Sequence, residues 1–295
     1  MRVAVIVVNF NDSKDTIKYV KQIAQYQNIN RIVVVDNGST DENEMERLRD
    51  LMSEKVVVLQ ADKNGGYNYG NNFGIRYLEQ NGENYDYLVI SNPDIEIEEK
   101  AISECLQVLE ENQDVGIAAP RMVNADGNPV RRSSWKMRTF ALDVIHSTRL
   151  LELLFYAKLR KGEYSEKEYA QKCLQVEAIS GAFFVMKQEI WQQIGGFDEN
   201  VFLFYEEDIL AKKVQEIGKK MVSVNHVKFC HYESQAIGKT LSYYRKMQQL
   251  YQSKLYYQKQ YNQIKAWQIA VFQILNWARK IELFFEVPLR KILKK

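Results

Sequence analysis

The 295-residue chain has few of the residues that mark small cross-linked or fibrous proteins: three cysteines, four prolines and fourteen glycines. Cys105, Cys173 and Cys230 lie far apart and form no C-x-x-C pair. This pattern argues against a disulfide scaffold or a cysteine zinc site, and it favours a reducing cytoplasmic compartment. So little proline and glycine also excludes collagen-like and proline-rich material.

Long apolar runs and two common nucleotide-binding motifs are also missing. No stretch of about 18 uncharged apolar residues occurs, so we predict no transmembrane helix. The apolar run over residues 3–8 is short and ends in polar residues, which indicates a buried strand rather than a signal peptide. Neither G-x-G-x-x-G after this strand nor G-x-x-x-x-G-K-S/T is present. These absences argue against NAD binding and against a simple ATPase.

The composition is that of a packed globular protein, with 46% hydrophobic and 26% charged residues. The formal net charge of +2 hides an asymmetry. Residues 239–295 contain twelve lysines and arginines but only two acids, Glu282 and Glu286, whereas residues 1–238 contain 28 basic and 36 acidic residues. A basic tail on an acidic body suggests that the tail meets an anionic partner.

Short β-branched runs alternate with amphipathic segments through most of residues 1–238. This alternation predicts an α/β fold with a mostly parallel, Rossmann-like sheet flanked by helices. Residues 131–172 are the least regular and are expected to hold an insertion or a mobile loop, and the pattern is mostly helical from Thr240 onward. We expect strands at residues 3–8, 31–35, 56–59, 87–90, 115–119, 176–186 and 221–224, and helices near residues 12–25, 42–52, 69–79, 99–111 and 207–217.

Clusters of polar residues follow the first four predicted strands. Because the carboxyl ends of parallel strands meet at one edge of a sheet, these clusters are expected to converge where open α/β sheets bind ligands. Asparagine, aspartate and glycine together favour a polar ligand with hydroxyls and phosphates over ordinary loop composition. The four clusters are Asn9–Asn11, Asp36–Asp41, Asp62–Gly66 and Ser91–Asp94.

Asp94 ends an Asn-Pro-Asp turn, which directs a carboxylate from a rigid loop. A divalent cation that bridges to a diphosphate needs few protein oxygens, because Mg²⁺ keeps waters and takes substrate phosphates as ligands. Taken alone, Asp94 is better explained as a plain turn residue or as a cap for the next helix.

Six short segments of the chain, taken in order, carry a resemblance to a known family. They resemble the inverting family-2 glycosyltransferases of the GT-A fold, and the Asn-Pro-Asp turn is similar to that of the rhamnosyltransferase-like branch. The resemblance covers about residues 1–235. The segments are Val7–Asn11, Val34–Asp41, Asn64–Asn72, Asn92–Asp94, Gly195–Glu199 and Tyr205–Asp208.

The resemblance implies roles for individual side chains. Asp208 matches the general base that takes a proton from the acceptor hydroxyl, and Glu206 and Glu207 beside it are expected to raise its pKa. Asp94 matches the residue that holds Mn²⁺ or Mg²⁺ on the diphosphate, with His231 near the metal. The matching nucleotide-sugar contacts are Asn9, Asp36, Asn64 and Asn92.

Structural explanations also fit two of these motifs. The acids Glu206–Asp208 could be residues favoured at a helix N-terminus by the helix dipole. His231 could equally be a core or loop histidine with satisfied hydrogen bonds.

The last part of the chain is expected to form a basic amphipathic helix. From Trp267 to Leu293 apolar residues recur at helical spacing, with lysines and arginines among them. Such a helix can lie on an anionic membrane, and it can equally dock on its own domain or join a homodimer. We therefore divide the chain into a GT-A domain, residues 1–238, and a helical tail, residues 239–295.

These observations predict a metal-dependent inverting glycosyltransferase of the hexosyltransferase class, bound peripherally to the inner face of the cell membrane. The expected donor is a dTDP- or UDP-sugar, with L-rhamnose as one candidate. The expected acceptor is a saccharide or polyprenyl-lipid-linked chain of a growing surface polysaccharide, and no nucleic-acid partner is expected. The alternatives are a non-catalytic nucleotide-sugar-binding or assembly subunit, and a sugar nucleotidyltransferase, whose glycine-rich basic N-terminal signature is absent.

Overall fold

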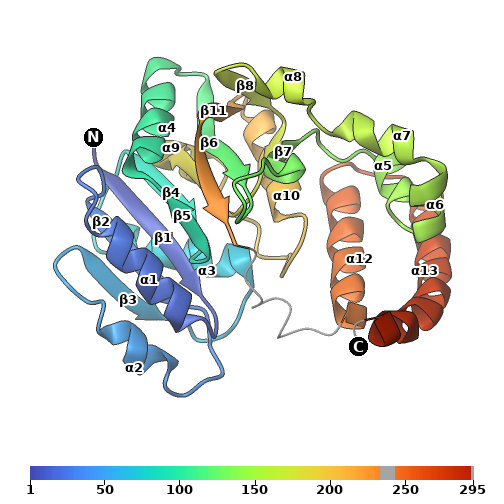
Figure 1. Cartoon of the computed structure of the whole chain (residues 1–295), viewed down its shortest axis with the longest axis horizontal. Coiled ribbons are helices and arrows are strands. Elements are labelled where there is room, and N and C mark those ends of the chain that lie inside the picture. The colour runs from blue at the N-terminus through green and yellow to red at the C-terminus, as the bar shows by residue number, and fades with distance from the viewer. Residues whose placement is uncertain (233–242, 294–295) are drawn as a thin grey trace.

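A central sheet with helices on both faces forms most of the molecule, and two long C-terminal helices stand beside it (Figure 1). The structure is a computed structural model that describes residues 1–232 and 243–293. Within these residues the main sheet has nine strands, and eight of them follow the order β3-β2-β1-β4-β10-β6-β11-β5. The expected α/β class with a mostly parallel sheet is confirmed.

The N-terminal half of the sheet is parallel and buried. β1 (Val3–Asn9) lies between β2 (Arg31–Asp36) and β4 (Tyr87–Ser91), and β3 (Val56–Gln60) extends the sheet beyond β2. Continuous β-branched runs suit this position, because helices cover both faces of the strands. The four strands therefore end at one common edge.

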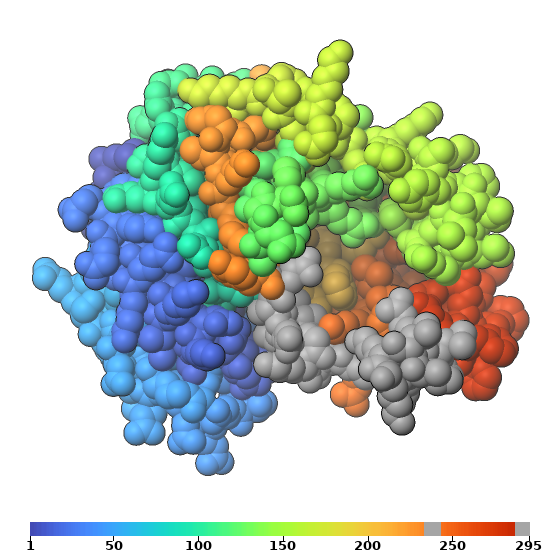
Figure 2. All heavy atoms as spheres, in the orientation of Figure 1, coloured from blue at the N-terminus to red at the C-terminus, as the bar shows by residue number. Residues whose placement is uncertain are grey.

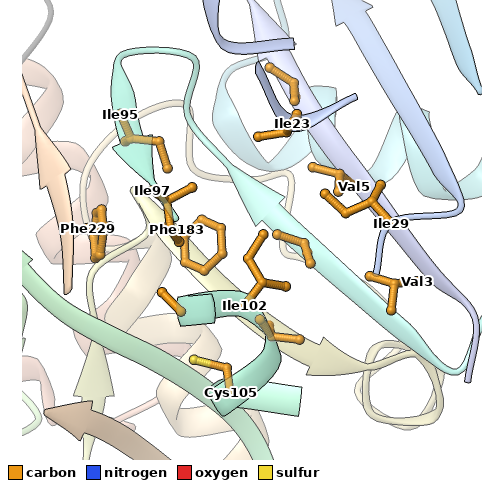
Figure 3. Packing of buried hydrophobic residues seen from close by; sticks show 14 of the residues in the cluster. Val3, Val5, Ile23, Ile29, Ile95, Ile97, Ile102, Cys105, Phe183 and Phe229 are labelled. Atoms are coloured by element: carbon orange, nitrogen blue, oxygen red, sulfur yellow. The ribbon is translucent and has the colours of Figure 1, made fainter. Parts of the chain in front are cut away.

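Alternate residues of β1 point into two different cores, as strand geometry requires. Val5 joins a cluster under α1 (Ser13–Ile23), α2 (Glu44–Arg49) and α4 (Glu99–Glu111), part of which is drawn in Figure 3. Ile6 joins the cluster on the opposite face, under α3 (Tyr67–Gln80), α9 (Gln188–Gln193) and α10 (Glu206–Glu216). Burial on both faces fixes the register of the sheet.

The C-terminal half of the sheet mixes strand directions. β10 (Phe183–Lys187) runs antiparallel to β4 and β6 (Val115–Val123), and β11 (Lys220–His231) runs parallel to β6. β5 (Ile95–Ile97) and β8 (Cys173–Val176) pair antiparallel with β11. β11 is longer than predicted because a register irregularity beyond Val224 lets pairing resume at Lys228.

The prediction of one strand over residues 176–186 is wrong. The segment contains the end of β8, a two-residue strand β9 (Ala178–Ile179), a turn at residues 180–182 and then β10. β9 pairs with β7 (Ser134–Trp135) in a separate small sheet. The turn breaks the strand where Gly181 approaches the side chain of Glu207.

The irregular segment over residues 131–172 is an insertion of short helices. Thr139, Thr148 and Ser165 each cap one of them by accepting a hydrogen bond from a backbone amide. Helices this short leave almost no periodicity in the sequence. They are the 3₁₀ helices Arg131–Ser133 and Arg160–Gly162 and the helices α5 (Phe140–Ile145), α6 (Arg149–Leu154), α7 (Tyr156–Leu159) and α8 (Glu166–Tyr169).

The mostly helical pattern predicted from Thr240 onward corresponds, within the described residues, to α12 (Tyr243–Gln260) and α13 (Ala266–Leu293). Tyr257 of α12 is buried against Tyr205 and Ile209 at the start of α10. The predicted domain boundary between residues 238 and 239 lies outside the described residues. Among the residues described, none of the helices combines the length and the hydropathy needed to span a bilayer.

Gly66 allows two loops to touch at the edge of the sheet. Its φ is +87°, and an added Cβ would overlap the carbonyl oxygen of Phe202. We expect Gly66→Ala to lower the free energy of unfolding by about 2 kcal/mol, because it combines left-handed strain with a backbone clash. Urea unfolding would measure the change. Gly82→Ala is the matched control, since Gly82 also has positive φ but open space around it, and an equal loss there would contradict the clash.

Candidate active site

Asn9 and Asp36 end β1 and β2 and are partners in the strand register. Nδ2 of Asn9 donates to Asp36 Oδ1 at 3.1 Å and to Glu44 Oε1 at 3.1 Å, while Asn9 Oδ1 accepts from Thr16 at 2.8 Å. Both side chains are buried. Asn9 thus ties β1, β2, α1 and α2 together and orients the Asp36 carboxylate.

The loops after β2 and β3 are in direct contact. Nδ2 of Asn37 donates to the Gly66 carbonyl at 2.9 Å, and Asn64 Oδ1 accepts from the Gly66 amide at 3.1 Å. Gly38 fits against Asn64 because it has no Cβ. Asn64 is half-buried at the rim of this contact, so the predicted residues Asn9, Asp36 and Asn64 lie on adjoining loops.

Asp94 and His231 form a second group at the same edge. Asp94 precedes β5 and His231 ends β11, and the antiparallel pairing of these strands places Asp94 Oδ2 3.3 Å from His231 Nε2. The two side chains are 5% and 19% exposed. A carboxylate and an imidazole suit Mn²⁺, while Mg²⁺ would rely more on oxygen ligands.

The residue set fits a cation that takes its other ligands from water and phosphate. Within residues 1–232 and 243–293, histidine, cysteine, aspartate and glutamate form no group of three that could hold a metal. Asn92 is half-buried in the Asp94 turn, and its backbone amide donates to the Ala182 carbonyl at 2.9 Å.

The third group surrounds Asp208 at the start of α10. Phe204 and Tyr205 have left-handed backbone conformations with φ of +69° and lead the chain into the helix. Asp208 is 2% exposed. Its Oδ1 accepts from Trp135 Nε1 at 3.2 Å, and its Oδ2 lies 3.3 Å from Nε of Arg138. Both partners come from the insertion.

Burial raises the pKa of Asp208 to about 6, although the nearby charge of Arg138 acts to lower it. Glu207 and Asp143 add to the increase, and the hydrogen bond from Trp135 opposes it. The expectation that a neighbouring acid raises this pKa holds for Glu207, but burial is the larger cause. Such a carboxyl is largely ionised at neutral pH and still basic enough to accept a proton.

The turn at residues 180–182 links these groups. The Gly181 amide donates to Glu207 Oε1 at 3.2 Å, and Tyr67 at the start of α3 donates to the Gly181 carbonyl at 2.6 Å. The backbone carbonyl of Ala182 accepts a hydrogen bond from the backbone amide of Asn92 in the Asp94 turn.

Figure 2 shows the surface hollowed between the insertion and the C-terminal helices, with atoms from the segment around residue 200 at its floor.

Several residues of this site were not predicted from the sequence. Trp135 and Arg138 lie in the irregular insertion, where no periodicity or motif marks them. Gly181 lies inside a predicted strand. Tyr67 follows the Gly-Gly pair within Asn64–Asn72, one of the segments that carry the family resemblance, so the sequence does mark its neighbourhood.

Comparisons with known proteins show which family the chain resembles. The family model "Glycosyl transferase family 2" matches residues 4–195. The low-salt glycan biosynthesis hexosyltransferase Agl10 of Haloferax volcanii is 30% identical over 206 residues, which are 69% of this chain and 58% of that enzyme. The N-acetylglucosaminyl-diphospho-decaprenol L-rhamnosyltransferase of Mycobacterium tuberculosis is 23% identical over 70% of this chain and 68% of its own length.

Solved structures share the fold at low sequence identity. GalNAc-T7 with UDP, GalNAc and Mn²⁺ gives a TM-score of 0.59 at 13% identity, covering 79% of this chain and 44% of that one. The mannosyltransferase PcManGT of Pyrobaculum calidifontis with GDP-Man and Mn²⁺ gives 0.56 at 16% identity, covering 86% and 62%.

The acids at the start of α10 should make stability depend on pH. Burial, followed by repulsion from Glu207, raises the pKa of Glu206 from 4.5 to about 8. The folded chain therefore keeps a proton that the unfolded chain has lost, so stability falls as pH rises from about 4.5 to 8. Glu206→Gln should remove part of this slope and be more stable than wild type at pH 8.

Urea unfolding at pH 5 and pH 8 would measure the slope. Glu216→Gln, at the exposed far end of the same helix, should leave the slope as in wild type. An equal slope in wild type and Glu206→Gln would show that the carboxyl is not held in its neutral form.

Proposed function

Since the chain belongs to glycosyl transferase family 2, we propose that it moves a sugar from a nucleoside diphosphate to an acceptor hydroxyl, with inversion at the anomeric carbon. The observation that carries this proposal is that one turn, residues 180–182, hydrogen-bonds to residues close in sequence to two unlike carboxylates, Asp94 and Asp208. Asp94 lies with His231, which suits a cation and a diphosphate. Asp208 is buried with a pKa of about 6, which suits proton transfer.

The proposed chemistry assigns Asp208 the role of general base. Its carboxylate accepts the proton of the acceptor hydroxyl as that oxygen bonds to the anomeric carbon, and the bond to the diphosphate breaks. Trp135 and Arg138 each contact one oxygen of the Asp208 carboxylate. These contacts fix the orientation of the carboxylate. Asp94 and His231 would hold Mn²⁺ or Mg²⁺, whose charge supports the leaving diphosphate.

Asp36 and Asn64 are the proposed contacts to the nucleoside, with Asn9 beneath Asp36 and Asn92 beside the diphosphate. We propose a dTDP- or UDP-sugar as donor and L-rhamnose as one candidate sugar. The acceptor is a saccharide or a polyprenyl-linked chain of a surface polysaccharide. The names of the Mycobacterium and Haloferax relatives support a lipid-linked acceptor and a glycan pathway.

We also propose that the protein lies peripherally on the inner, cytoplasmic face of the cell membrane. Trp277 and Phe284 of α13 are 66% and 76% exposed, and Leu153 of α6 is 64% exposed. The two helices meet where the Arg149 amide donates to Glu282 at 2.8 Å. Exposed basic residues nearby, which suit anionic lipid, are Lys158, Arg160, Lys161 and Lys280.

Replacing the proposed base tests the activity. Purified protein should release nucleoside diphosphate from a member of a nucleotide-sugar panel only with Mn²⁺ or Mg²⁺ and an acceptor. Asp208→Asn should lower kcat by about 10²–10⁴-fold while donor affinity is kept. Asp126→Asn, on an exposed hairpin turn, is the matched control.

Two outcomes would count against this reading. Turnover retained in Asp208→Asn but lost in Glu207→Gln would move the role of base to Glu207. Donor binding without turnover in the wild type would favour the non-catalytic subunit instead.

Substitutions on α13 test the membrane proposal in the full chain. Trp277→Ser with Phe284→Ser should abolish co-sedimentation with vesicles that contain phosphatidylglycerol, because the apolar anchor is lost. Met52→Ser removes an apolar side chain that is 56% exposed on another part of the surface and should leave binding intact. A change from dimer to monomer in light scattering, without loss of vesicle binding, would identify α13 as a subunit contact.

A further inference from the structure

The face of α12 that turns toward the domain carries polar groups. Lys254 and Gln258 are buried there, next to buried Tyr257. Burying an ammonium group and an amide destabilises a fold unless both find partners. Burial lowers the pKa of Lys254 to about 8. The partners of these two side chains explain their position.

Both side chains converge on Asp143 of α5. The Asp143 carboxylate is fully buried, and Gln258 Nε2 donates to its Oδ2 at 2.7 Å. The hydroxyl of Tyr205 donates to its Oδ1 at 2.6 Å. Lys254 Nζ donates to the Asp143 carbonyl at 3.3 Å and to Ser147 at 3.1 Å.

Arg138 lies between Asp143 and Asp208. Its Nη1 is 3.6 Å from Asp143 Oδ1, and its Nε is 3.3 Å from Asp208 Oδ2. Its carbonyl accepts from Tyr257 of α12 at 3.3 Å and from Asn262 at 3.1 Å. A guanidinium group is planar and rigid, so a shift of the Asp143 carboxylate would move the Arg138 guanidinium relative to Asp208.

We propose that α12 is part of the catalytic centre: Gln258 holds Asp143, and Asp143 positions the Arg138 guanidinium that holds Asp208. The proposal rests on the proposed role of Asp208 as base. Gln258 and Asp143 are therefore positioning residues, which act on the reaction through Arg138. The tail thus does more than attach the protein to a membrane or a second subunit.

A shift of the pH profile separates positioning from simple packing. The charged or titratable groups around Asp208 come from three elements: Arg138, Asp143 and Arg132 of the insertion, Tyr205, Glu206 and Glu207 of its own segment, and Tyr257 of α12. Lys254 of α12 faces Asp143 and Arg138. Of these groups, Arg138 is the cation that contacts Asp208. Weakening its hold on Asp208 therefore raises the pH at which the base becomes active.

Arg138→Gln should raise the acid-limb pKa of kcat/KM by about one unit or more, and Arg138→Lys should restore part of the shift. Gln258→Ala should shift the profile in the same direction by less. It should also lower kcat about tenfold or more at unchanged donor KM, since the base is misplaced. In the Arg138→Gln background it should add little. Gln260→Ala, two positions along the same helix and exposed, is the matched control.

If Gln258→Ala melts below the assay temperature, the Gln258→Met variant takes its place, because methionine keeps the side-chain volume of glutamine. A kcat and pH profile equal to those of Gln260→Ala would overturn the inference while the proposed function stands. A wild type without turnover would refute the proposed function instead. A double-mutant cycle on the free energy of unfolding would then test the network, and zero coupling between Gln258→Met and Arg138→Gln would overturn it.

Discussion

The proposed active site depends on one ion pair, between half-buried Arg138 and buried Asp208. Burial raises the pKa of the Asp208 carboxyl, which is 2% exposed. The guanidinium 3.3 Å away offsets part of this effect, and the resulting pKa is about 6. The left-handed backbone before α10, the small β7–β9 sheet and the insertion all place groups around this pair.

The order of the strands in the sheet brings the other predicted site residues together. β1 and β2 end beside each other, so Asn9 and Asp36 meet without any long loop. β5 turns back along β11, and this reversal brings Asp94 to His231 although 137 positions separate them in the sequence. Helices bury both faces of the sheet, so polar side chains gather at the edge where the strands end.

The sequence predicted the elements that repeat a pattern. The buried strands β1, β2 and β4 carry continuous apolar runs, and α1 and α4 carry clear amphipathic spacing, so their positions followed from burial alone. The neighbourhood of Asp94 and His231 was expected only through the family resemblance. Contacts across the sheet are set by pairing, which a single sequence does not display.

Other features left no pattern to read. The helices of the insertion are three to six residues long, too short for a face to repeat. Residues 176–186 are apolar throughout most of their length, and the break comes from Gly181 meeting a distant glutamate. Lys254 and Gln258 look like the solvent face of a helix in the sequence, and only the fold brings a buried carboxylate to them.

The contact between Gly66 and Phe202 joins the loop after β3, at the proposed nucleoside end, to the segment that leads into α10. Because the backbones touch with no side chain between them, neither loop can shift without moving the other. On the proposed function, we therefore expect binding at the nucleoside end to affect the helix that carries Asp208. A donor that binds first would order this segment before the acceptor arrives, which would be a structural basis for ordered addition of the two substrates.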